Sequence, residues 1–168
     1  SSLLLDFFLG LILTLIVQSS ATISIIAVTL INVGLLNLDD AIVLILGSSL
    51  GSGLSIALLS LNLSGLGKQI AWLQVLIKCV GVLFTSVLIF LEYKFSILGI
   101  IYLVKYLSFN PSIEVALFYC FLQIISAVLV TIIRNPALKF VEKLSPPTVE
   151  ETLSKTHYIY DEALSDPS

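Results

Sequence analysis

Polar residues divide a strongly apolar chain into a small number of segments. Residues 3–17 and 21–36 are both mainly apolar, and residues 37–40 form a polar corner after them. Each arm of about 15 residues would span roughly 23 Å as an α-helix, whereas a bilayer crossing needs about 20 residues. The polar residues 18–20 between the arms therefore predict a re-entrant helical hairpin with its tip at mid-membrane. A single kinked crossing helix is the alternative that this pattern leaves open.

The next apolar segment, residues 41–61, is interrupted at its centre by the run GSSLGSG at 47–53. Glycine in a helix interior costs about 1 kcal/mol relative to alanine, and lipid cannot solvate a freed backbone. We therefore predict a discontinuous helix, which transporters use to aim helix ends and bare carbonyl groups at ions. Close helix packing through small residues is the alternative, because Gly47 and Gly51 are four residues apart.

Three further apolar segments, residues 69–91, 96–107 and 113–133, are predicted to be transmembrane helices. The basic residues that follow the last segment predict a cytoplasmic C-terminal tail. Counting the crossings back from this tail puts the open end of the hairpin on the cytoplasmic side as well. We expect residues 1–145 to form a membrane region. Residues 146–168, which are polar and acidic, are expected to link it to a soluble helical domain beyond this chain.

Composition supports an all-α integral membrane protein and excludes other classes. The chain is 58% hydrophobic and 11% charged, whereas soluble domains are about 25% charged. A net charge of −3 supplies no basic surface for nucleic acid. An intramembrane hydrolase would need a base beside its serine, and the single histidine, His157, lies in the polar tail. The sequence therefore does not predict an enzyme.

Two groups of polar residues inside the apolar segments are candidates for a site. The first lies at and just after the predicted hairpin tip and comprises Gln18, Ser19, Ser20 and Thr22. Small polar side chains at bilayer depth are costly unless they line a cavity or bind a solute. The second is centred on Lys78, which should lie near the bilayer centre, where a lysine costs about 2.5–3.5 kcal/mol. Gln74 lies on the same helical face as Lys78, and Gln123 lies on the last apolar segment. Together these polar residues predict a water-filled vestibule or a structural contact with another part of the protein.

The polar runs resemble the motifs of a known family. VQSSAT at 17–22 resembles the Gln-Ser-Ser-Ser signature of type II sodium-dependent phosphate cotransporters, and GSSLGS at 47–52 resembles the Gly-Ala-Asn-Ile-Gly-Thr motif of bacterial members. The tail residues YDEAL at 160–164 are similar to the junction before a phosphate-uptake-regulator-like helical domain. This placement implies the second of two inverted repeats, so that the missing first repeat of the same protein would be the partner of this chain.

The resemblance implies sodium-driven import of inorganic phosphate across the cytoplasmic membrane, with sodium as the coupling ion and no other cofactor. Carried onto this sequence, the phosphate and sodium sites would involve Gln18, Ser19, Ser20 and Thr22 at the tip and Ser48, Ser49 and Ser52 at the glycine break. The sodium ligands among them would be Gln18, Ser19 and Ser49. The signature has one serine fewer than is usual in the family, and Ser49 stands where relatives have asparagine. A sodium-coupled carrier of another oxyanion and a non-transporting module coupled to a phosphate-regulatory domain are the alternatives.

Overall fold

The computed structural model describes residues 2–95, 99–108 and 110–149, and all regular structure within them is helical. Seven α-helices follow one another along these residues: α1 (Leu3–Val17), α2 (Ser20–Asn32), α3 (Leu38–Ser60), α4 (Gly65–Phe95), α5 (Ile100–Leu107), α6 (Pro111–Ile132) and α7 (Arg134–Leu144). The predicted all-α fold is thereby confirmed for this part of the chain. His157 and residues 160–164, and with them most of the predicted linker, lie outside the described residues.

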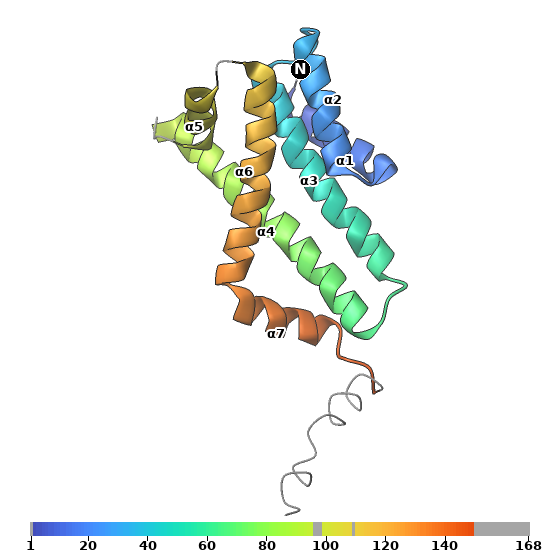
Figure 1. Cartoon of the computed structure of the whole chain (residues 1–168). Helices are drawn as coiled ribbons and strands as arrows, with labels where there is room; N and C mark the ends of the chain where they lie inside the picture. The colour runs from blue at the N-terminus through green and yellow to red at the C-terminus, as the bar shows by residue number, and fades with distance from the viewer. Residues whose placement is uncertain (1, 96–98, 109, 150–168) are drawn as a thin grey trace, which may run out of the picture.

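The first two helices form a hairpin whose tip is at Gln18 and Ser19 (Figure 1). The α1 helix runs in the same direction as α3, because Phe7 meets Gly47 while Thr14, further along, meets Gly51. The open end of the hairpin lies at the start of α3, where Leu3, Asn37 and Asp39 line one cavity. The sequence pattern was also compatible with a single kinked crossing helix. The structure has two separate helices in place of it.

The predicted break in the third helix is absent, and this prediction was wrong. The α3 helix is continuous over 23 residues and includes the whole run from Gly47 to Gly53. The small residues instead allow α1 to pack closely on α3, since a Cβ at Gly47 would overlap the carbonyl oxygen of Phe7. The alternative of close packing is the correct one, because contact between the two helices offsets the weak helix propensity of glycine.

Three helices are long and apolar enough to cross a membrane, namely α3, α4 and α6, among the described residues. The prediction of a crossing at residues 96–107 was wrong. The α5 helix has eight residues, or about 12 Å, which is too short to cross. Its first turn stays at the end of α4, because the Glu92 carboxylate accepts hydrogen bonds from the backbone N–H groups of Ile101 and Tyr102 at 3.0 and 2.6 Å.

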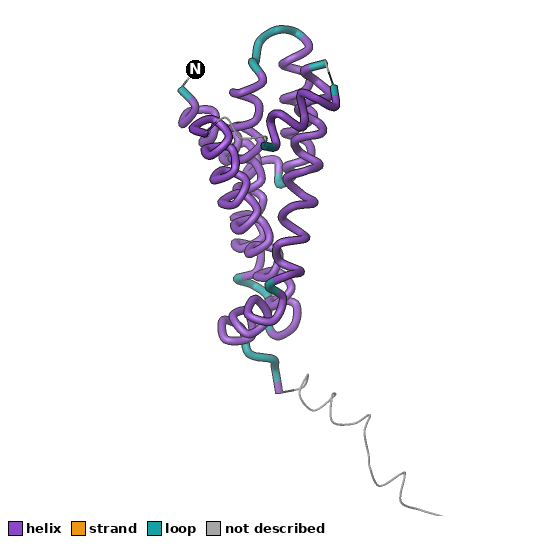
Figure 2. The backbone as a smooth tube through the Cα atoms, turned by 90° about the vertical axis from the view of Figure 1, so that its left-hand side faces the viewer, coloured by secondary structure: helices purple, strands orange, loops and turns teal. Residues whose placement is uncertain are grey.

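The two ends of the elongated bundle are therefore distinct (Figures 1 and 2). At one end, the Tyr93 hydroxyl donates a 2.8 Å hydrogen bond to Asp39, and Ser112 at the start of α6 bonds Asn32 at the end of α2. At the other end α7 lies across the bundle, and the Gln69 amide donates to the Ser145 carbonyl oxygen at 2.8 Å. The hairpin opening and α7 are thus at opposite ends. The sequence placed both on the cytoplasmic side, whereas in the structure they lie at opposite ends of the three membrane-length helices found among the described residues.

The core lies where α2, α3 and α6 meet. Its largest side chains with no exposed surface are Ile23, Ile45, Phe118 and Leu122. Many large apolar side chains face outward, such as Leu83 on α4, which is 68% exposed, and Ile124 on α6, which is 58% exposed. An apolar exterior around an apolar core is the distribution that a lipid environment requires.

Candidate functional site

The hairpin tip is a tight turn in which two polar residues join two helices. Gln18 has φ 59°, in the left-handed region, and its backbone N–H donates to the Thr14 carbonyl oxygen at 2.6 Å. Ser19 begins α2, and its Oγ accepts hydrogen bonds from the Thr22 backbone N–H at 3.3 Å and the Thr22 hydroxyl at 2.9 Å. The side chains of Gln18 and Thr22 are exposed. The tip thus presents an amide and hydroxyl groups at the N-terminus of α2, which carries a partial positive charge.

Ser20 connects the tip to the middle of the bundle. It is buried, and its Oγ lies 3.2 Å from the phenolic oxygen of Tyr119 on α6. Tyr119 is near the midpoint of the 22-residue α6, so the tip lies about halfway along a helix that is long enough to cross a membrane. Tyr119 is not among the site residues predicted from the sequence. Its position one turn before Gln123 on the same helix was the signal that could have identified it.

Lys78 and Gln123 form a direct pair one helical turn from Tyr119. The Lys78 ammonium donates to Gln123 Oε1 at 2.7 Å, while Gln123 Nε2 is buried with no hydrogen-bond partner among the described residues. Lys78 also packs against α3, since a Cβ at Gly53 would lie 3.1 Å from its Cβ. Helix α6 therefore contacts α2 through Tyr119 and α4 through Gln123, one turn apart.

The predicted serines of α3 form no side-chain hydrogen bond with the hairpin tip among the described residues. Ser48, Ser49 and Ser52 are all buried. The hydroxyl of Ser48 donates to the Ile45 carbonyl oxygen at 2.8 Å, and that of Ser52 donates to the Ser49 carbonyl oxygen at the same distance. These hydroxyls are bonded within their own helix, and Ser48 packs near Gly10 of α1.

Gln74 also lies outside these contacts. It is one turn before Lys78 on α4, and its side chain is exposed. No hydrogen bond joins it to the hairpin in the part of the chain that the structure describes. Among the residues predicted around Lys78, only Gln123 is therefore placed beside it.

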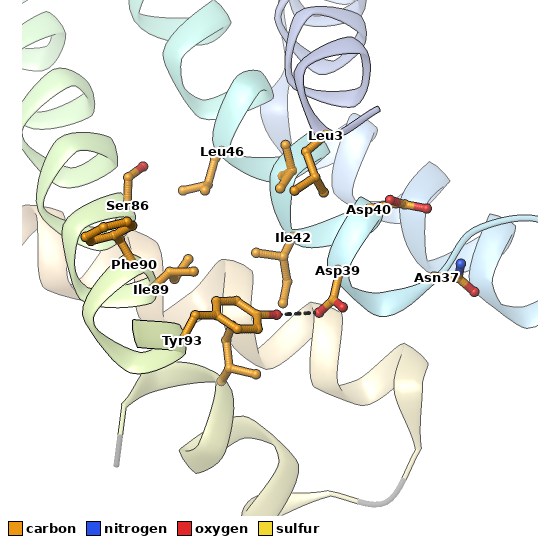
Figure 3. A pocket seen from close by; sticks show the side chains of 12 residues that line it. Leu3, Asn37, Asp39, Asp40, Ile42, Leu46, Ser86, Ile89, Phe90 and Tyr93 are labelled. Carbon is orange, nitrogen blue, oxygen red and sulfur yellow. Dashed lines mark hydrogen bonds between the residues drawn. The ribbon is translucent and has the colours of Figure 1, made fainter. Parts of the chain in front are cut away.

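A separate cavity of about 590 Å³ lies at the open end of the hairpin (Figure 3). Apolar side chains such as Ile42, Leu46 and Phe90 form much of its wall, and the bond between Tyr93 and Asp39 crosses one side of it. It contains none of the predicted site residues. The sequence showed only a polar corner here, because the cavity is formed by helices that are distant along the chain.

Three membrane-length helices within an apolar exterior define a multi-pass helical membrane protein. A family model for the Na+/Pi-cotransporter matches residues 1–109, which include the hairpin, α3, α4 and α5. The chain belongs to the Na+/Pi-cotransporter family, and the resemblance that the motifs indicate is confirmed at this level. No curated protein and no solved structure matches the chain.

Membership of this family, which is a family of transporters and not of enzymes, implies sodium-coupled phosphate transport in general. It implies a membrane environment, phosphate and sodium as substrates, and sodium as the coupling ion.

Proposed function

We propose that this chain forms one wall of the phosphate and sodium site in a sodium-coupled phosphate importer of the cytoplasmic membrane. The observation that carries the proposal is the hairpin tip, which exposes the side chains of Gln18 and Thr22 and whose buried Ser20 contacts Tyr119 near the middle of α6. If α6 crosses the membrane, the tip beside its middle lies near the bilayer centre. The hairpin would then be re-entrant. Polar groups at that depth are expected to bind a solute.

The chemistry of the tip suits the two proposed substrates. A dehydrated phosphate needs several donors, which Gln18, Ser20, Thr22 and the N-terminus of α2 can supply. Sodium prefers hydroxyl and carbonyl oxygens, for which we propose Gln18, Ser19 and Ser49.

The remaining candidates are assigned supporting roles. Ser48 and Ser52 would contribute if their hydroxyls turned away from their own helix carbonyls. Gln74, Lys78 and Gln123 are proposed to line the vestibule. The other wall of the site would come from the first repeat of the same protein.

The distribution of charge supports an orientation in the membrane. The α7 end carries Lys68, Arg134, Lys139 and Lys143, which favours the cytoplasmic side. We therefore propose that the C-terminal tail is cytoplasmic and that the hairpin opens to the outside. This orientation also places Lys68 on the cytoplasmic side.

The test is uptake of radiolabelled phosphate by vesicles that contain the intact protein, with and without an inward sodium gradient. Wild type should show sodium-dependent uptake. Gln18→Gly should lose it, because glycine accepts the left-handed backbone of the turn but removes the amide. Gln18→Asn is the matched control, since asparagine keeps an amide and tolerates this conformation. Gln18→Ala also removes the amide, but alanine disfavours the left-handed backbone conformation of this turn.

The outcome separates the candidate functions. Sodium-dependent uptake that is lost only with the amide supports the phosphate site at the tip. Sodium-dependent flux of sulfate without phosphate uptake would indicate another oxyanion as cargo. An absence of any sodium-dependent flux in folded protein would contradict transport and favour a module that couples the membrane to a regulatory domain.

A further inference from the structure

An intramembrane lysine meets a neutral partner at the centre of the bundle. Lys78 lies near the middle of the 31-residue α4, and its ammonium donates to Gln123 Oε1 on α6 at 2.7 Å. The two helices approach closely nearby, because a Cβ at Gly81 would overlap the side chain of Ser126. The amide oxygen supplies a dipole but no negative charge, so this contact leaves the charge of Lys78 uncompensated.

Gln123 is itself only partly satisfied. Its Nε2 is buried and has no hydrogen-bond partner among the described residues. An ammonium group and an unpaired amide N–H that adjoin one another are both donors. The amide N–H has no acceptor among the described residues, whereas the ammonium has the neutral oxygen of Gln123. A negatively charged acceptor placed between them would satisfy the amide N–H and also neutralise Lys78.

The pair adjoins the hairpin tip. Tyr119 is one turn before Gln123, and its phenolic oxygen lies 3.2 Å from Ser20 Oγ in the first turn of α2. The stem of Lys78 is held from the other side by the backbone of α3 at Gly53. Helices α2 and α4 thus contact α6 one turn apart, at Tyr119 and at Gln123, and α3 packs on Lys78 beside the second contact.

We propose that Lys78 and Gln123 form an oxyanion subsite next to the hairpin tip, with Lys78 as the cation that selects a charged cargo. In the absence of an anion, Gln123 Oε1 acts as the acceptor for the ammonium. An arriving oxyanion accepts from the ammonium and from the free Nε2, so both donors are satisfied. This inference rests on the proposed function and names the group that balances the charge of the cargo. Phosphate and sulfate share the required chemistry.

The first test measures phosphate uptake by the intact protein in vesicles for Lys78→Gln, Lys78→Arg and Lys68→Gln. Lys78→Gln should raise the KM for phosphate about tenfold or more, with a much smaller change in maximal rate, because a charge-assisted hydrogen bond is lost. Lys78→Arg keeps the charge and should stay within about threefold of wild type. Lys68→Gln is the matched control, since it removes a cation from the first turns of the same helix, and it should behave like wild type.

Gln123→Glu provides a second variant that preserves the contact. The carboxylate is nearly isosteric with the amide and would pair with Lys78, so the bundle should still form. It would also neutralise the ammonium and repel an anion, and we expect phosphate uptake to fall at least about tenfold. If the pair were only structural, Gln123→Glu would transport like wild type. A KM for Lys78→Gln or an uptake rate for Gln123→Glu equal to that of wild type would overturn the inference.

Thermal stabilisation of the solubilised protein by phosphate and by sulfate distinguishes this inference from the proposed function. A ligand that binds the folded state raises its Tm, whether or not it is transported. We expect an oxyanion to raise the Tm of wild type and Lys78→Arg but not of Gln123→Glu. Stabilisation by sulfate without phosphate uptake would support the subsite and contradict phosphate transport. No stabilisation of wild type, or equal stabilisation of wild type and Gln123→Glu, would overturn the subsite.

Discussion

At the scale of single residues, glycines decide how closely two helices approach. A Cβ at Gly10 of α1 would overlap the Leu44 carbonyl oxygen of α3, and one at Gly51 would lie 2.6 Å from the Leu11 carbonyl oxygen. Gly47 meets Phe7 in the same manner. Without a strong hydrophobic driving force between helices in lipid, such close packing is a main source of association. The same residues that suggested a broken helix therefore hold the hairpin against α3.

Gly47→Ala should separate α1 from α3, because its new methyl group meets backbone that cannot rotate away. We expect a loss of about 1–3 kcal/mol in the free energy of unfolding, seen as a lower Tm of the protein in detergent.

Gly67→Ala is the matched control for this substitution. Gly67 is also helical, and a Cβ there meets nothing within 4 Å. Its Tm should stay the same or rise slightly, since alanine favours helix over glycine. Equal Tm values for the two variants would contradict the packing role of Gly47.

At the scale of elements, the hairpin depends on a cap at the start of α2. Ser19 accepts both the backbone N–H and the hydroxyl of Thr22, so it ends the turn and begins the helix. Gln18 takes the left-handed conformation that reverses the chain. These two residues serve the turn as well as the proposed site, so stability and binding must be measured separately.

Ser19→Ala should cost about 1 kcal/mol, because the first turn of α2 loses its cap. The measurement is the Tm together with hydrogen exchange at the Thr22 amide, which should become faster. Ser19→Asp should keep the cap and the stability, yet abolish phosphate uptake through repulsion at the tip.

Thr29→Ala serves as the control, because Thr29 is an exposed residue of the same helix whose hydroxyl donates to the Ile25 carbonyl oxygen. It should leave both stability and uptake close to wild type. A Ser19→Ala variant as stable as Thr29→Ala would show that the cap does not hold the turn.

At the scale of the whole molecule, the number of crossings decides which sides the loops face. The α4 helix ends where α5 begins, and α6 begins beside the end of α2. Residues that precede α6 therefore lie at the same end of the bundle as the hairpin opening. A polypeptide with α3, α4 and α6 as its crossings places α7 at the opposite end.

Labelling with a membrane-impermeant thiol reagent tests this topology. In a protein whose Cys79 and Cys120 are replaced by alanine, Asn37→Cys and Asn110→Cys should react from the same side of the membrane, which we propose is the outside. Lys143→Cys should react only from the other side. Labelling of Asn37→Cys and Asn110→Cys from opposite sides would show that residues 96–107 do cross.

The sequence alone determined the class of this protein. The resemblance of its motifs to those of phosphate cotransporters indicated the family to which the chain belongs. Its apolar segments and polar interruptions predicted a helical membrane protein with a turn at Gln18. These predictions succeed because burial in lipid imposes long apolar runs and internally bonded helices, both of which are local properties of the chain. The polar residues at the tip were visible for the same reason, since they are unusual among apolar neighbours.

Only the tertiary structure decided what the ambiguous local patterns mean. The run around Gly47 is compatible with a broken helix or a packed one, and contact with α1 selects the packed form. The apolar residues around Tyr102 suggested a crossing, but Glu92 holds the helix that contains them at one end of the bundle. The pairing of Lys78 with Gln123 joins residues that are 45 positions apart. Spacing along a chain cannot specify such contacts, because they depend on how separate helices pack.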